Sequence, residues 1–119
     1  MLTKKTPDEI KARLTHKAMG VENTIMLTYH NHSPEVFEAF IKNPETMKIP
    51  EGVTSETLGI AHINAAYALF VVKSFDDGTA DDFPLTRDGL IDLEQHWPGT
   101  LIGIVQGYHR ARGASVEKN

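Results

Sequence analysis

The stretch from Glu56 to Phe75 limits the possible folds more than any other part of the chain. Drawn as a helix, it is apolar almost all the way round, and only His62 and Lys73 share a polar sector. A helix of this kind is either buried by neighbours on several sides or crosses a membrane. Its uniformly apolar run, residues 65–72, is far shorter than the roughly 18 residues that a membrane span needs. The sequence therefore predicts a buried central helix.

An all-α fold follows, a single compact domain in which about five to six helices pack around the central one. Apolar residues recur at helical spacing in the segments 7–19, 34–42, 56–75, 87–97 and 99–112. Start signals support this prediction: Thr6 with Pro7 opens a capping box, Ser33 precedes Pro34, and Thr86 can cap the fourth segment. A loop over 44–53 is expected before the central helix.

Three segments leave alternatives open. Residues 21–32 have apolar residues at helical spacing, but 24–29 also suits a strand by composition. We favour the helix, because no hairpin partner with a tight turn stands out nearby. Residues 101–105 likewise admit a strand. The acidic segment 76–82 is interpreted as a solvated connector, since it lacks the alternating ligands and the closing Glu of a Ca²⁺ loop.

The length of 119 residues fits a single domain, 1–119, and we expect disordered tails at 1–5 and 113–119. Cysteine is absent, which excludes disulfides and Cys-ligated zinc. A formal charge of −4 argues against a broad nucleic-acid face, which normally needs a basic excess. No apolar run follows the N-terminal lysines, so we expect no secretion signal and a cytoplasmic protein without a membrane anchor.

Six histidines invite a metal hypothesis. His30 and His32 share a face only on a strand, since on a helix they point about 200° apart, and no spacing supports His62 or Glu35 as a further ligand. The sequence contains no Gly-x-Ser-x-Gly elbow and no glycine-rich phosphate loop. We therefore expect no metal, no cofactor and no catalytic residue. A histidine-based metalloenzyme is the alternative if the protein is an enzyme.

Glycines recur every four residues in the last predicted helix, at Gly99, Gly103 and Gly107. Glycine inside a helix costs about 0.8–1.0 kcal/mol relative to alanine, so close approach of another backbone is the usual compensation. We predict close helix packing here, against the alanines of the central helix (Ala61, Ala65 and Ala68). A contact between subunits is the alternative, with Arg110 and Arg112 at its rim.

The C-terminal sequence LEQHWPGTLIGIVQGYHRARGASVEKN, together with the size and helix order of the chain, resembles the tail assembly chaperones of long-tailed (siphovirus-type) bacteriophages. The resemblance implies a chaperone that binds the tape measure protein, and possibly the tail tube protein, while the tail tube assembles in the host cytoplasm. It also implies a short form and a frameshifted longer form. Glu117-Lys118-Asn119 can be encoded by GAA-AAA-AAC, which contains the slippery heptamer A-AAA-AAC that suits such a shift.

A chaperone of this kind would shield apolar segments of its client and self-associate, which requires exposed apolar grooves. The residues expected to form that surface are Leu101, Ile104, Val105, Tyr108, Arg110, Arg112, Phe37, Phe40 and Ile41. A small helical regulatory or antitoxin-like adaptor is the alternative function.

Overall fold

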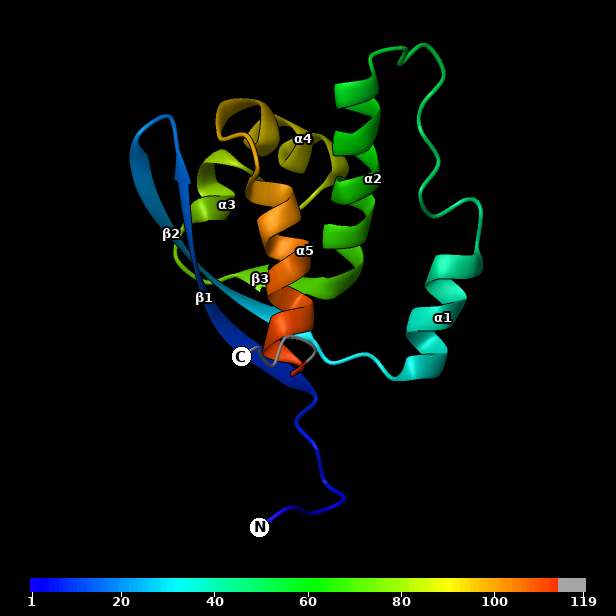
Figure 1. The fold of residues 1–119 in the computed structure, drawn as a ribbon, viewed down its shortest axis with the longest axis vertical. Helices are drawn as coiled ribbons and strands as arrows, with labels where there is room; N and C mark the ends of the chain where they lie inside the picture. The colour runs from blue at the N-terminus through cyan, green and yellow to red at the C-terminus, as the bar shows by residue number, and fades with distance from the viewer. Residues whose placement is uncertain (114–119) are drawn as a thin grey trace, which may run out of the picture.

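The computed structural model describes residues 1–113 and combines a three-stranded antiparallel sheet with five helices (Figure 1). In chain order the elements are β1 (Glu9–Ala18), β2 (Val21–His30), α1 (Pro34–Lys42), α2 (Glu56–Val71), β3 (Val72–Phe75), α3 (Thr79–Asp82), α4 (Arg87–His96) and α5 (Thr100–Ala111). The fold is therefore mixed α/β, and the prediction of an all-α domain is wrong.

The predicted helices over 7–19 and 21–32 are instead the two strands of a long hairpin. Residues 9–18 alternate between exposed and less exposed side chains, as expected for a strand with one covered face. Met19 and Gly20 join the strands with φ values of 53° and 80°. Positive φ at both turn residues is the type I′ geometry whose twist matches that of antiparallel strands. Thr6 consequently caps no helix.

The central helix is also shorter than predicted. α2 ends at Val71, and Val72 has extended backbone angles, φ −89° and ψ 126°. The chain then continues directly as β3, which pairs antiparallel with β2 and gives the sheet order β1-β2-β3. The two valines at this junction have β-branched side chains, which favour strands.

One face of the sheet carries the hydrophobic core. Leu27 and Tyr29 of β2 are buried against α2, α4 and α5, whose fully buried side chains include Ala65, Leu90 and Leu101. The opposite face of the hairpin has exposed side chains at alternate positions of β1. The molecule is thus a helical layer on one side of a sheet whose other side is open.

Three of the remaining helices agree with the prediction, whereas α3 lies in the segment 76–82 that was expected to be a connector. α1, α4 and α5 lie within the predicted segments, and Ser33 and Thr86 accept hydrogen bonds from Val36 N and Gly89 N, as N-caps do. The interval 101–105 is helical. Figure 1 shows α1 at the periphery, followed by the predicted loop that returns to α2.

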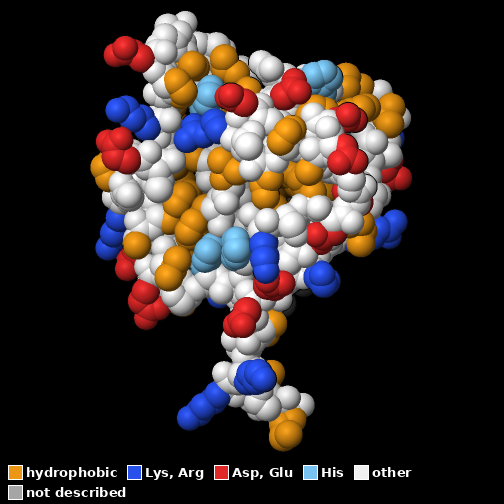
Figure 2. Space-filling view, turned by 180° about the vertical axis from the view of Figure 1, so that it is seen from behind, with side chains coloured by type: hydrophobic (Ala, Val, Ile, Leu, Met, Phe, Trp, Pro, Cys, Tyr) orange, Lys and Arg blue, Asp and Glu red, His pale blue; other side chains and the backbone are white. Residues whose placement is uncertain are grey.

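Within residues 1–113, no helix is both long enough and apolar enough to cross a membrane. The N-terminal segment before β1 has no helix or strand and projects from the body (Figures 1 and 2). Residues 114–119, which include most of the predicted C-terminal tail and the suggested frameshift site, lie outside the described part of the chain.

Candidate functional site

Most of the apolar residues expected to contact a client are part of the core. Leu101, Ile104 and Tyr108 have no exposed surface, Val105 is 7 % exposed and Phe40 is 8 % exposed. The apolar face of α5 therefore packs inward. These five side chains are not available to a partner in this structure, and their assignment to an exposed surface is corrected.

The other expected contact residues are more accessible. Ile41 is about half exposed, Arg110 and Arg112 are exposed, and Phe37 is partly buried. Arg112 Nε donates to Asn31 Oδ1 at 2.8 Å, which fixes this guanidinium at the end of the sheet. Arg110 lies beside β1, in a groove described below.

The three glycines differ in their surroundings, and none of them packs on the alanines of α2. Gly99 has a φ of 92° at the N-cap of α5, a left-handed conformation that L side chains rarely adopt. A Cβ on Gly107 would lie 2.7 Å from Leu14 and 2.8 Å from the Tyr29 hydroxyl, so this glycine permits close approach of the sheet. A Cβ on Gly103 would meet nothing within 4 Å.

A cluster of aromatic and histidine side chains holds α1 to the body. His32 stacks on Phe70 with centroids 4.0 Å apart, and Phe40 stacks on the same ring at the same separation. His32 Nε2 also lies 2.7 Å from the Phe70 carbonyl oxygen and donates to it. That carbonyl is in the last turn of α2, where carbonyls lack partners within the helix.

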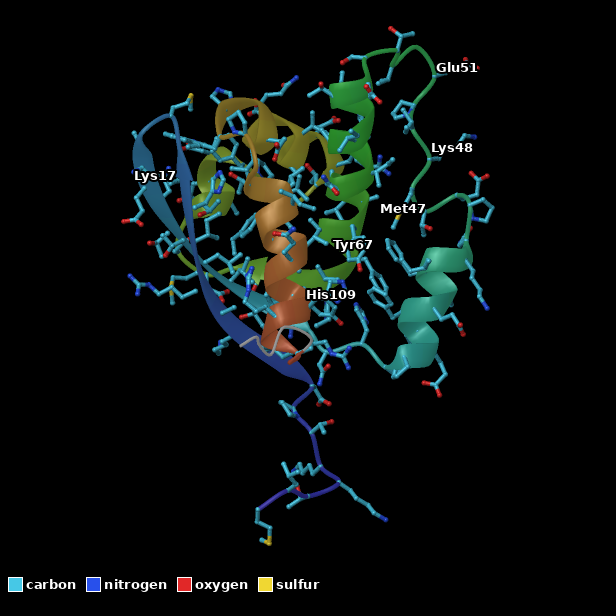
Figure 3. All side chains as sticks on the ribbon, in the orientation of Figure 1. Lys17, Met47, Lys48, Glu51, Tyr67 and His109 are labelled. Atoms are coloured by element: carbon cyan, nitrogen blue, oxygen red, sulfur yellow. The ribbon has the colours of Figure 1, made fainter. Side chains whose placement is uncertain are left out.

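Two further contacts involve His109 and the backbone of His62. The Tyr67 hydroxyl lies 2.6 Å from His109 Nε2, and Figure 3 shows these two side chains facing each other from α2 and α5. Burial raises the pKa of the Tyr67 hydroxyl, which keeps it protonated. Arg87 donates to the carbonyl oxygen of His62 at 3.3 Å. Among residues 1–113, no group of three or more His, Asp or Glu could hold a metal ion.

Asp76 and Asp77, the first two acids of the segment 76–82, form hydrogen bonds that connect the end of β3 to β2. Asp76 accepts from the Thr28 hydroxyl at 2.6 Å, and Asp77 accepts from the backbone N–H of Met26 at 2.9 Å. The hydrogen bond from Thr28, followed by that from Ser74, lowers the pKa of Asp76. This part of the acidic segment therefore extends the strand pairing, a role that the sequence interpretation missed.

The longer of the two edge strands of the sheet is β1, with ten residues against four in β3. In a β-turn the first and fourth residues share a hydrogen bond, so Ala18 and Val21 form a hydrogen-bonded pair. Hydrogen-bonded and non-bonded pairs alternate along an antiparallel ladder. The N–H and C=O groups of Lys11, Arg13, Thr15 and Lys17 therefore point away from β2. Within the described chain, no backbone hydrogen bond outside the hairpin ladder involves residues 9–18.

A groove of about 540 Å³ runs beside this edge, between β1 and α5. The β1 residues 12–16, from both faces of the strand, line it together with Ile25 of β2, so the groove opens at the edge and reaches beneath the hairpin. Its floor is apolar or small, with Leu14, Ile104 and Gly103, and Arg13 and Arg110 stand at its sides. No Asp or Glu is among its lining residues.

The edge strand is basic although the whole chain is acidic. Lys11, Arg13 and Lys17 are exposed on β1, and none of them forms an ion pair within residues 1–113. The one carboxylate of the strand, Glu9, is paired with Lys73. Asp76 lies near enough to Lys11 for its pKa to be affected, and Glu22 is opposite Lys17 in the register. Arg13 lies opposite Met26, which carries no charge.

Comparisons of the chain with protein-family models, with curated protein sequences and with solved structures found no match.

Proposed function

We propose that the chain is a phage tail assembly chaperone, which binds the tape measure protein in the host cytoplasm while the tail tube assembles. The supporting observation is the C-terminal helix pair, in which α4 and α5 flank Trp97-Pro98-Gly99. This is the helix–Pro–helix arrangement on which the sequence resemblance depends. Two strands replace the first two predicted helices, so the helix order no longer supports the resemblance, and the proposal depends on this C-terminal arrangement.

The geometry of the turn between these helices gives the arrangement a physical basis. Pro98 cannot continue a helix, because it lacks an N–H donor. The carboxylate of Glu94 then accepts from Gly99 N at 2.7 Å and from Leu101 N at 2.9 Å, so α4 supplies the N-terminal cap of α5. Both helices are held against the core, and the fully buried side chains Leu90 of α4 and Leu101 of α5 belong to it.

Co-expression with the tape measure protein tests the proposal. We expect the two proteins to elute together and the tape measure protein to remain in the supernatant only when the chain is present. A folded chain that never co-elutes, while the tape measure protein stays insoluble, would rule the proposal out. Co-elution with a co-encoded toxin instead would favour the antitoxin-like adaptor.

The frameshifted pair is a separate part of the proposal. We expect the nucleotide sequence across codons 110–119 to contain the heptamer A-AAA-AAC in the frame that a −1 shift needs. An open reading frame should continue beyond it. A sequence without the heptamer would remove the frameshift and leave the binding function to the co-expression experiment.

A further inference from the structure

We propose that the outer edge of β1 is a docking site for an extended acidic segment of a partner protein, which adds to the sheet as a further strand beside β1. This inference rests on the proposed function in one respect, since the segment would belong to the client. The site itself is argued from three features of the edge: its backbone, its groove and its charge.

The backbone of β1 offers hydrogen-bonding groups with which an added strand could form a ladder. β1 is ten residues long, and its outward N–H and C=O groups have no backbone partner in the described chain. An unpaired edge is a template for another strand, and peptides bind many domains by adding to such an edge. Natural edges are often protected from pairing by charged side chains, especially Lys, and the cations of β1 protect it in this way against strands that carry no opposite charge.

The groove supplies space for side chains on the inner side of the added strand. Successive residues of a strand point to opposite faces, so every second residue of the segment would face the space between β1 and α5. Gly103 leaves that space open, since no atom lies within 4 Å of the position that its Cβ would occupy. The apolar floor at Leu14 and Ile104 suits small or medium apolar side chains.

The charge selects an acidic segment. The residues of the added strand on the outer face would lie opposite Lys11, Arg13 and Lys17, which point to the same side. Opposite charges in such cross-strand pairs are stabilising. Arg110 adds a cation on the side of α5.

The same charges disfavour a second copy of this chain as the occupant. Among the antiparallel registers that keep outer side chains on one face, the two longest set Arg13 opposite its own copy or Lys11 opposite Lys17. The first of them also sets Glu9 opposite Lys17, but Glu9 is already paired with Lys73. Like charges directly opposite each other are destabilising. The edge is therefore fitted to a different, acidic chain.

The test uses a capped, fluorescently labelled peptide as long as β1 that alternates Glu with Val, titrated with the full chain. A Lys/Val peptide is the charge control. Two further Glu/Val peptides are N-methylated at alternate residues, so that one of them blocks the edge that would face β1. We expect the Glu/Val peptide and one methylated form to bind, and the other two to fail. Equal binding of both methylated forms would show that no ladder forms and would overturn the proposal, as would no binding of the Glu/Val peptide.

Matched variants locate the site. Lys17→Glu and Lys48→Glu change the net charge equally, and Figure 3 shows these lysines on opposite sides of the molecule, on the hairpin and on the loop before α2. We expect Arg13→Glu and Lys17→Glu to weaken binding by about tenfold each, because attraction becomes repulsion, and Lys48→Glu to leave it unchanged. Equal losses in all three would show non-specific attraction and overturn the site.

A final variant separates the groove from the charges. Gly103→Leu places a side chain in open space and should leave the fold intact while it excludes the inner side chains of the peptide. We expect unfolding by urea to show a folded variant whose affinity is reduced by at least about tenfold. Unchanged affinity would overturn the groove as part of the site. Dimerisation in sedimentation velocity that the peptide reverses would assign the edge to a second copy.

Because the peptide is defined by its chemistry alone, these outcomes do not depend on the tape measure protein. Peptide binding without co-elution of the tape measure protein would retain the site and reject the proposed client. Co-elution of the tape measure protein without peptide binding would retain the proposed client and reject the site at β1.

Discussion

Gly103 and Gly107 occupy equivalent positions one helical turn apart, yet a methyl group at each would have opposite effects. At Gly107 it would press on Leu14 and on the buried Tyr29 hydroxyl, whereas at Gly103 it would meet open space. Overpacking typically costs about 1–3 kcal/mol, and replacing an interior helical glycine by alanine gains about 0.8–1.0 kcal/mol. We therefore predict that Gly107→Ala lowers the free energy of unfolding and that Gly103→Ala raises it.

Urea unfolding of the two variants beside the wild type measures this difference, and each variant serves as the control for the other. If both substitutions changed stability in the same direction, the position of α5 on the hairpin would be wrong.

Tyr29 provides the second prediction at this scale. Its side chain is fully buried, its hydroxyl donates to the Ile104 carbonyl oxygen at 2.6 Å, and its ring meets Tyr108 edge-on. A typical hydrogen bond of this kind contributes about 0.5–1.5 kcal/mol. Tyr29→Phe keeps the ring and should lower the free energy of unfolding by that amount in urea. A variant as stable as the wild type would mean that the hydroxyl does not reach α5.

At the scale of elements, the attachment of β3 to β2 should depend on pH. The pKa of Asp76 is lowered by its hydrogen bonds, first from Thr28, so the unfolded state binds more protons than the folded state in that range. The contribution of Asp76 is present above its ordinary pKa of about 3.9 and is lost as the pH falls through the lowered value. Asp76→Asn should therefore be less stable than the wild type at pH 7, and the two should converge in acid.

Thermal unfolding at a series of pH values gives the comparison. Asp81→Asn, at an exposed carboxylate of the same acidic segment that makes no side-chain hydrogen bond in the described chain, is the matched control. A gap between wild type and Asp76→Asn that stays constant down to pH 2, or widens in acid, would contradict the hydrogen-bonded role of this carboxylate.

The sequence predicts some elements well, because their end signals are local. Ser33 and Thr86 cap α1 and α4 as expected, and Pro98 separates α4 from α5. β1 was misread because Ile10, Leu14 and Ala18 are four residues apart, a spacing that fits a helix and is also a multiple of the strand period. Ala12 and His16, which alternate with charged residues, carry the signal that distinguishes the two.

The end of α2 and the hairpin turn were missed for different reasons. No Gly, Pro or Asn marks the passage from Val71 to Val72, so an apolar run continues through a change of structure. The turn at Met19 lacks the Asn-Gly or Asp-Gly pair that identifies a type I′ hairpin in a sequence. Pairing of β3 with β2 then depends on contacts far apart in the chain.

At the scale of the whole molecule, the candidate site also depends on contacts between segments that are far apart in the chain. The apolar stripe of α5 fits a client surface and a core equally well, and only the position of the hairpin decides that Leu101 and Tyr108 are buried. The basic edge was visible in the sequence as cations at alternate positions of residues 9–18. Recognising these cations as part of a sheet edge required the strand assignment, and within residues 1–113 that edge has no backbone partner.

The measurement that tests the central claim, that the chain holds its client along β1, is amide hydrogen exchange in the complex with the tape measure protein. Residue-level mass spectrometry should find the amides of Lys11, Arg13, Thr15 and Lys17 unprotected in the free chain and slowed at least about tenfold in the complex. Ala12 and Leu14, which bond to β2, should be protected in both. A stable complex in which the four outward amides exchange as fast as in the free chain would contradict the account.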